Sequence, residues 1–93
     1  LMLDGRDTLP MSGLGYVRSL IERIGNRAVI ASIGGRYFGM DRDHRWPRTV
    51  KWYDAAVRGI GPSCADPLDF IQANYDRGVT DEFQEPAVVV RDG

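Results

Sequence analysis

The apolar positions along the chain alternate between helical spacing and the unbroken runs of buried strands. Residues 12–24 place an apolar side chain every three or four positions, which predicts an amphipathic helix with Ser12 as N-cap and Gly25 as its stop. The apolar face of this helix would consist of Leu14, Val17, Leu20, Ile21 and Ile24. The β-branched run "RAVIASI" at residues 27–33 predicts a buried strand.

Two further helices are predicted in the second half of the chain. Pro47 suits the first turn of a helix that runs to about Arg58, and Asp66 followed by proline gives the same start signal for a helix that ends near Gly78. The inward-facing residues would be Val50, Tyr53 and Val57 in the first helix and Leu68, Ile71 and Tyr75 in the second. The aromatic residues expected in the core are Trp46, Trp52 and Tyr53. Arg48 is expected on a solvated helix face.

Apolar runs at the two ends of the chain complete the pattern with a strand at residues 1–3 and another at residues 87–90. The resulting order of strand, helix, strand, helix, helix, strand predicts an α/β fold with a mostly parallel sheet flanked by helices. The length of 93 residues suffices for one small domain. Because the chain opens on what reads as the end of a strand, we expect residues 1–93 to be part of a longer protein.

A polar loop follows each of the first two predicted strands. The loop "DGRDT" carries Arg6 and Asp7, and the loop "GGRYFGMDRDHRW" carries Arg36 and Arg42. The carboxyl ends of neighbouring parallel strands meet at one edge of a sheet, where α/β proteins bind their ligands. We therefore expect the two loops to converge.

The charge of these loops has two interpretations. Clustered arginines repel one another unless an anion lies between them, and the planar guanidinium group suits carboxylate and phosphate. Alternatively, the loops are solvated turns in which Arg36 pairs with Asp41 and Asp43, Arg6 lies on the surface and Asp7 marks a helix entry. The residues alone leave both interpretations open.

Other classes of site receive little support. The net charge of −1 argues against a nucleic-acid partner, and no apolar run is long enough to span a membrane. The glycine pattern matches neither a P-loop nor a dinucleotide fingerprint. Asp41 and Asp43 are too few ligands for a metal, and His44 is more typical of an exposed residue or a helix cap. Cys64, the only cysteine, is expected to be structural in a reducing compartment.

Several segments, taken in order, resemble one enzyme family. These are "LDGRDT" before an amphipathic helix, the strand "AVIASI", then "GRYFGMDRDHRW" and "YDAAVRGIG", and finally "TDEFQEPAVV". In sequence and spacing they resemble the cofactor-independent phosphoglycerate mutases of the alkaline phosphatase superfamily. The resemblance extends over almost the whole chain.

The resemblance implies a larger two-domain enzyme that interconverts 3-phosphoglycerate and 2-phosphoglycerate in glycolysis and gluconeogenesis. Its phosphatase-like domain carries a nucleophilic serine and two divalent metal ions, manganese or magnesium, and an inserted domain holds the phosphoglycerate. Residues 1–93 resemble part of that insert and would bind no metal themselves. The parent enzyme would be monomeric and cytoplasmic, and the isolated chain would be inactive.

The family's motifs assign roles to four residues of this chain. Its substrate-binding Arg-Asp pair corresponds to Arg6 and Asp7, and its two later substrate arginines correspond to Arg36 and Arg42. Asp7 would also be catalytic, as the group that accepts a proton from the glycerate hydroxyl. The chain has Gly34 where the family usually has serine, and "DTLP" where it commonly has Asp-Thr-Pro-Pro. A non-catalytic anion-binding or interaction module derived from the insert remains the alternative.

Overall fold

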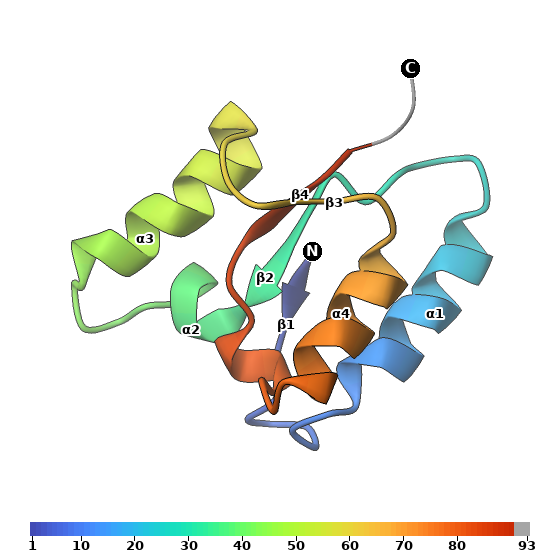
Figure 1. Ribbon diagram of the computed structural model, residues 1–93, viewed down its shortest axis with the longest axis horizontal. Helices are drawn as coiled ribbons and strands as arrows, with labels where there is room; N and C mark the ends of the chain where they lie inside the picture. Colours follow the sequence, from blue (N-terminus) through green and yellow to red (C-terminus); the bar gives the residue numbers. More distant parts are fainter. Residues whose placement is uncertain (91–93) are drawn as a thin grey trace.

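The computed structural model describes residues 1–90, which form a four-stranded sheet with helices on both faces (Figure 1). The elements in chain order are β1 (Met2–Leu3), α1 (Gly13–Ile24), β2 (Ser32–Gly35), α2 (Arg36–Gly39), α3 (Trp46–Tyr53), the π-helical segment η1 (Asp54–Arg58), β3 (Ser63–Cys64), α4 (Pro67–Asp76), the 3-10 turn η2 (Asp81–Phe83) and β4 (Ala87–Val89). The predicted α/β fold class is therefore confirmed. No helix within residues 1–90 is long and apolar enough to cross a bilayer.

The strands follow the order β1-β2-β4-β3. β1 pairs in parallel with β2, and β3 pairs in parallel with β4, whereas β2 and β4 run antiparallel. The two parallel pairs therefore point in opposite directions, and β1 and β2 finish at the same edge of the sheet. β3 was not expected from the sequence, because Ser63 and Cys64 lie in a stretch rich in turn-forming residues.

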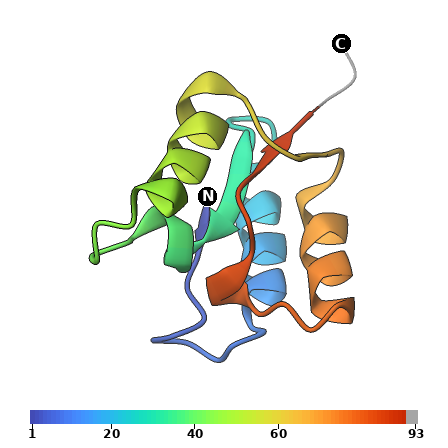
Figure 2. The same cartoon turned by 60° about the vertical axis from the view of Figure 1, so that its left-hand side comes forward.

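Helices α1 and α4 lie side by side on one face of the sheet, and α2 and α3 cover the other (Figures 1 and 2). The buried core cluster comprises Leu3, Val17, Ile33, Ile71 and Ala87. These residues come from three strands and from the two helices of the first face, so most of the apolar core lies between the sheet and the α1–α4 pair.

The predicted bounds of α1 and α4 are confirmed. α1 stops where Gly25 adopts a positive φ of 57°, and its amide donates to the carbonyl of Ile21. α4 begins behind Asp66, whose carboxylate accepts a hydrogen bond from the amide of Leu68 at 2.8 Å. Ser12, in contrast, does not cap α1, because its hydroxyl donates to the carbonyl of Leu9.

The predicted inner face of the helical run formed by α3 and η1 is wrong. Val50, Tyr53 and Val57 are 52%, 54% and 64% exposed, and Trp46 is also exposed. The residues turned away from solvent are instead Arg48, Trp52 and Ala55, which follow one another at helical spacing.

Two glycines, Gly34 and Gly39, explain why this other face points inward. A Cβ added to Gly34 would lie 2.9 Å from the ring of Trp52, and one added to Gly39 would lie 3.4 Å from it. The absence of side chains at these two positions makes room for the large indole ring of Trp52. Only Trp52 of the three aromatic residues expected in the core is packed inward.

Candidate functional site

Strand register brings the two arginine-bearing loops together. In the parallel pair of β1 and β2, Leu3 lies opposite Gly35, so the next residues of the two strands, Asp4 and Arg36, are neighbours. Nη1 of Arg36 is hydrogen-bonded to Oδ1 of Asp4 and lies 3.0 Å from Oδ2 of Asp7. The predicted convergence is therefore observed, but the carboxylate partners of Arg36 come from the first loop and not from Asp41 or Asp43.

Arg36 is held between two carboxylates of different exposure. The side chains of Arg36 and Asp4 are 18% and 34% exposed, whereas that of Asp7 is 85% exposed. The hydrogen bond from Arg36 lowers the pKa of Asp4, and the hydrogen bonds to Asp4 and Asp7 raise the pKa of Arg36. Asp4 thus anchors Arg36, while the exposed Asp7 carboxylate stays open to solvent and to a ligand.

A small polar pocket of about 120 Å³ opens beside this pair. Its lining consists of Arg6, Arg36, Tyr37, Met40, Asp41, Arg42, Asp43, Arg48 and Glu82. Four arginines, two from loops and two from helices α2 and α3, therefore border one hollow. Such a concentration of guanidinium groups is suited to carboxylate or phosphate.

The turn η2 forms the floor under both loops. A Cβ added to Gly35 would overlap the carbonyl oxygens of Asp81 and Glu82, and one added to Gly5, at a φ of 71°, would lie 2.7 Å from the amide of Glu82. The amide of Gly35 donates to the carbonyl of Gln84 at 2.8 Å. Glycine at these two positions lets the loop backbones rest directly on the turn.

Two acidic residues of η2 connect it to the first loop and to helices α1 and α4. Glu82 forms an ion pair with Arg6, with 3.7 Å between Oε1 and Nη1. Asp81 is 1% exposed, and its carboxylate accepts hydrogen bonds from the amide of Gly13 at 2.7 Å and from the hydroxyl of Tyr75. Asp81 thereby takes the capping role at the start of α1 that was expected of Ser12.

Arg48 also belongs to this site, contrary to the solvated position expected for it. Its side chain is only 20% exposed, and its guanidinium lies 3.8 Å from the centroid of the Tyr37 ring and 3.6 Å from Oδ1 of Asp41. The sequence contained a signal for this placement, because Arg48 precedes Trp52 by one helical turn. This spacing shows that Arg48 and Trp52 share one face of α3, but it does not show that this face points inward.

Of the predicted site residues, Arg6, Asp7, Arg36 and Arg42 all lie at this end of the sheet. The residues not anticipated are Asp4, Arg48, Asp81 and Glu82. Asp4 could have been found from the strand register, whereas Asp81 and Glu82 act across more than sixty residues of sequence and carried no local signal. His44 is exposed, with a φ of 56°. Burial raises the pKa of the Cys64 thiol, which lies in β3, away from this pocket.

A metal centre is not evident in the part of the chain that the structure describes. Residues 1–90 contain no group of three or more histidine, cysteine or acidic side chains arranged to hold a metal ion. The carboxylates of the site instead face arginines, which already balance their charge.

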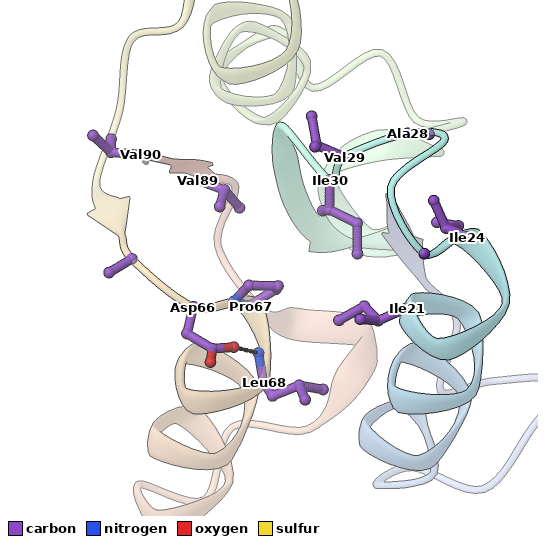
Figure 3. A pocket seen from close by; sticks show the side chains of 12 residues that line it. Ile21, Ile24, Ala28, Val29, Ile30, Asp66, Pro67, Leu68, Val89 and Val90 are labelled. Carbon is purple, nitrogen blue, oxygen red and sulfur yellow. Dashed lines mark hydrogen bonds between the residues drawn. The ribbon is translucent and has the colours of Figure 1, made fainter. Parts of the chain in front are cut away.

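A second hollow lies at the opposite end of the sheet, between the end of α1 and the start of α4 (Figure 3). It has a volume of about 450 Å³. Its lining is mostly apolar and includes Ile21, Ile24, Val29, Ile30, Leu68 and Val89. Asp66 is the one charged residue of the lining, and its carboxylate is occupied with the amide of Leu68 (Figure 3). This groove has no arginine, and none of the predicted site residues lies in it.

Known proteins are similar to this chain in sequence and in fold. Residues 1–93 match the family described as BPG-independent PGAM N-terminus (iPGM_N). The chain is 47% identical over 93 residues to a 2,3-bisphosphoglycerate-independent phosphoglycerate mutase of Moorella thermoacetica, and 45% identical over 89 residues to one of Thermomicrobium roseum. These alignments cover 98% and 94% of this chain but only 18% and 17% of the two relatives.

A solved structure agrees with the sequence comparisons. A crystal structure of Leishmania mexicana phosphoglycerate mutase at low cobalt concentration superimposes with a TM-score of 0.78 and 30% sequence identity, covering 94% of this chain and 18% of that one. The chain thus spans about a fifth of the length of the proteins it matches. The family match over all 93 residues, the sequence identity and the shared fold lead to one conclusion: the chain belongs to the 2,3-bisphosphoglycerate-independent phosphoglycerate mutase family.

Proposed function

We propose that this chain is the part of a phosphoglycerate mutase that grips the glycerate portion of the substrate. The observation that carries the proposal is the meeting of Arg36 and Asp7 from two separate loops, beside a pocket bordered by Arg6 and Arg42. The full-length enzyme would interconvert 3-phosphoglycerate and 2-phosphoglycerate; its relatives are named 2,3-bisphosphoglycerate-independent phosphoglycerate mutases. Residues 1–93 would belong to its substrate-binding insert domain.

The reaction requires that the glycerate is bound through groups other than the phosphoryl group. In the mutase, that group leaves one glycerate hydroxyl and returns to the other, so the glycerate must be held by its carboxylate in between. Arginine forks from Arg6, Arg36 and Arg42 suit this task, because paired N–H donors fix the orientation of a planar anion. Asp4 does not disturb this arrangement of arginines, because it contacts Arg36 from the side of β1.

Asp7 is proposed as the proton acceptor and donor for the glycerate hydroxyls. Its carboxylate is 85% exposed and only 3.0 Å from Arg36, so a substrate bound to the arginine would lie within reach of it. When a hydroxyl oxygen attacks the phosphoryl group, Asp7 would take its proton, and it would return a proton to the oxygen that the group leaves.

The phosphoryl-carrying serine and the divalent metal ions, manganese or magnesium, would belong to another part of the full-length enzyme. The metal would stabilise the charge of the transferred group there. No step by residues 1–90 is assigned to a metal, since this part of the chain offers no suitable ligand group. We further propose a cytoplasmic, monomeric enzyme of glycolysis and gluconeogenesis, with no nucleic-acid or membrane partner.

The proposal is tested by two substitutions in a full-length mutase that carries this segment. Arg36→Lys keeps the charge but loses the fork, and should lower kcat/KM roughly tenfold to a hundredfold. Asp7→Asn keeps the shape but loses the base, and should lower kcat by about 10²–10⁴ with a smaller change in KM. Arg58→Lys is the control, because Arg58 pairs with Asp54 on the exposed side of η1.

Wild-type kinetics in both site variants would refute the clamp and the proton transfer together. If Arg36→Lys is impaired while Asp7→Asn is not, the site binds the substrate and Asp7 only shapes the loop. The isolated chain should show no mutase turnover in an assay coupled to enolase. If it binds 3-phosphoglycerate in an NMR titration and the full-length protein also lacks turnover, the non-catalytic anion-binding module is the better description.

A further inference from the structure

The loop between α2 and α3 is organised by one buried carboxylate. Asp41 accepts hydrogen bonds from the amides of Asp43 at 3.1 Å and Arg45 at 2.7 Å, and its side chain is 1% exposed. These two bonds close the loop around Arg42, whose side chain contributes to the wall of the polar pocket. The direction in which Arg42 points therefore depends on where Asp41 is held.

Arg48 is the side chain that holds Asp41 from α3. Its guanidinium lies 3.6 Å from Oδ1 of Asp41 and stacks on Tyr37 of α2, 3.8 Å from the ring centroid. The Tyr37 ring in turn packs against that of Phe83 in η2, with 5.0 Å between centroids. Arg48 thus joins α3, the loop, α2 and the floor of the site.

Only arginine can make these contacts at once. The flat guanidinium group covers an aromatic face while its N–H groups point sideways at a carboxylate, whereas the ammonium group of lysine is a compact charge that cannot do both. With one face on Tyr37 and an edge at Asp41, Arg48 has little freedom left to turn toward a ligand. Its place at the pocket wall is that of a support for Arg42.

We propose that Arg48 is a positioning residue of the anion site, which acts through Asp41 to direct Arg42 and does not itself contact the substrate. This inference rests on the proposed function, because it concerns the same pocket. It goes beyond that function by assigning a role to a residue outside the two loops.

The test is a double-mutant cycle in a full-length mutase that carries this segment, with kcat and KM measured for 3-phosphoglycerate. Arg48→Lys should raise KM about three- to tenfold and leave kcat within about twofold, because the loop loses its support while the catalytic groups stay. Arg42→Lys should raise KM at least as much. The double variant should have the KM of Arg42→Lys alone, since Arg48 acts only through Arg42.

Two further variants complete this test, one as an alternative to Arg48→Lys and one as a control. Tyr37→Leu removes the stacking surface and should reproduce the rise in KM, which keeps the inference testable if Arg48→Lys does not fold. Arg58→Lys is the matched control, since Arg58 also pairs with an aspartate along the same helical run, at 3.3 Å, but is 59% exposed and does not line the pocket. Its KM and kcat should equal those of the parent.

Each contrary result has a distinct meaning. Effects of Arg42→Lys and Arg48→Lys that multiply in the double variant would overturn the inference, because Arg48 would then act independently of Arg42. An unchanged KM in folded Arg48→Lys or Tyr37→Leu, with a raised KM in Arg42→Lys, would also overturn it and leave the proposed function standing. Wild-type kcat/KM in both Arg42→Lys and Arg36→Lys would refute the arginine clamp of the proposed function, and the inference would fall with it.

Discussion

At the end of the sheet where β1 and β2 finish, charged loops are tied to one another and to η2, whereas at the opposite end α1, α4 and β4 border an open apolar groove. Both ends contain the start of a helix, and the two caps show the difference. The cap of α4 is Asp66, which precedes its own helix and is exposed, while the cap of α1 is Asp81, which is buried and lies 68 residues away from Gly13 in sequence.

The loop end shows how a small domain can hold polar groups in fixed positions. Long-range hydrogen bonds and glycine contacts at the loop end leave few alternative arrangements, so a ligand would find the arginines already placed. The groove end relies on local capping and on apolar side chains that remain partly exposed. Substitutions at the two ends should therefore differ in their cost, even where the chemical change is the same.

The largest effect is expected where the loop backbone rests on η2. Gly35→Ala would force a methyl group into the carbonyl oxygens of Asp81 and Glu82, and should lower the free energy of unfolding by about 3 kcal/mol or more. Gly15→Ala, on the exposed side of α1 with no atom near its added Cβ, should instead stabilise the chain by roughly 0.5–1 kcal/mol. Urea unfolding followed by circular dichroism would measure both. Equal stabilities would show that η2 is not a rigid floor.

The two helix caps provide the next comparison. Asp81→Ala would leave the buried amide of Gly13 and the hydroxyl of Tyr75 without their acceptor, at a cost of about 2–3 kcal/mol. Asp66→Ala removes an exposed local cap and should cost about 1 kcal/mol. The denaturation midpoints of the two variants decide the matter. A larger loss of stability in Asp66→Ala than in Asp81→Ala would mean that the groove end is the more rigid of the two.

The same chemical change at a core position and at the groove gives a smaller contrast. Val17→Thr, at a residue 2% exposed, should cost about 1–3 kcal/mol because the hydroxyl is buried without a designed partner. Val29→Thr, at a groove residue 58% exposed, should stay within about 0.5 kcal/mol of the parent. Thermal melting of the pair is sufficient. A cost at Val29 similar to that at Val17 would mean that the groove wall is packed as tightly as the core.

The pH dependence of stability provides the last contrast. Burial and the hydrogen bond to Asp81 raise the pKa of Tyr75 from 10.0 to about 12. Between these values the unfolded chain has lost the tyrosine proton and the folded chain has kept it, so stability falls as the pH rises through this window. Tyr75→Phe should flatten the loss of stability above pH 10, and Tyr16→Phe, at a tyrosine 63% exposed, should not. Urea midpoints at a series of alkaline pH values would measure this.

Local information in the sequence was enough to predict much of the fold. Helical spacing, the Asp66-Pro67 start and the Gly25 stop predicted α1 and α4 with nearly their observed bounds, because each signal acts within one or two helical turns. The order of elements predicted the α/β class and, with it, the end of the sheet at which the arginine loops meet. The resemblance to the mutases then pointed to Arg6, Asp7, Arg36 and Arg42 as residues of the site.

The inward face of α3 and the contacts that support the site depend on the tertiary structure and could not be predicted from local sequence. The stripe of Trp46, Val50, Tyr53 and Val57 has the spacing of an inner face, but Trp52 packs on glycines of β2 and α2. Arg48 points inward with it. Periodicity alone cannot show which of two possible faces finds the better surface, because that surface is assembled from residues far away in sequence. The same reason applies to Asp81, which contacts the start of α1, and to Glu82, which contacts the first loop, because both contacts exist only after the chain has folded.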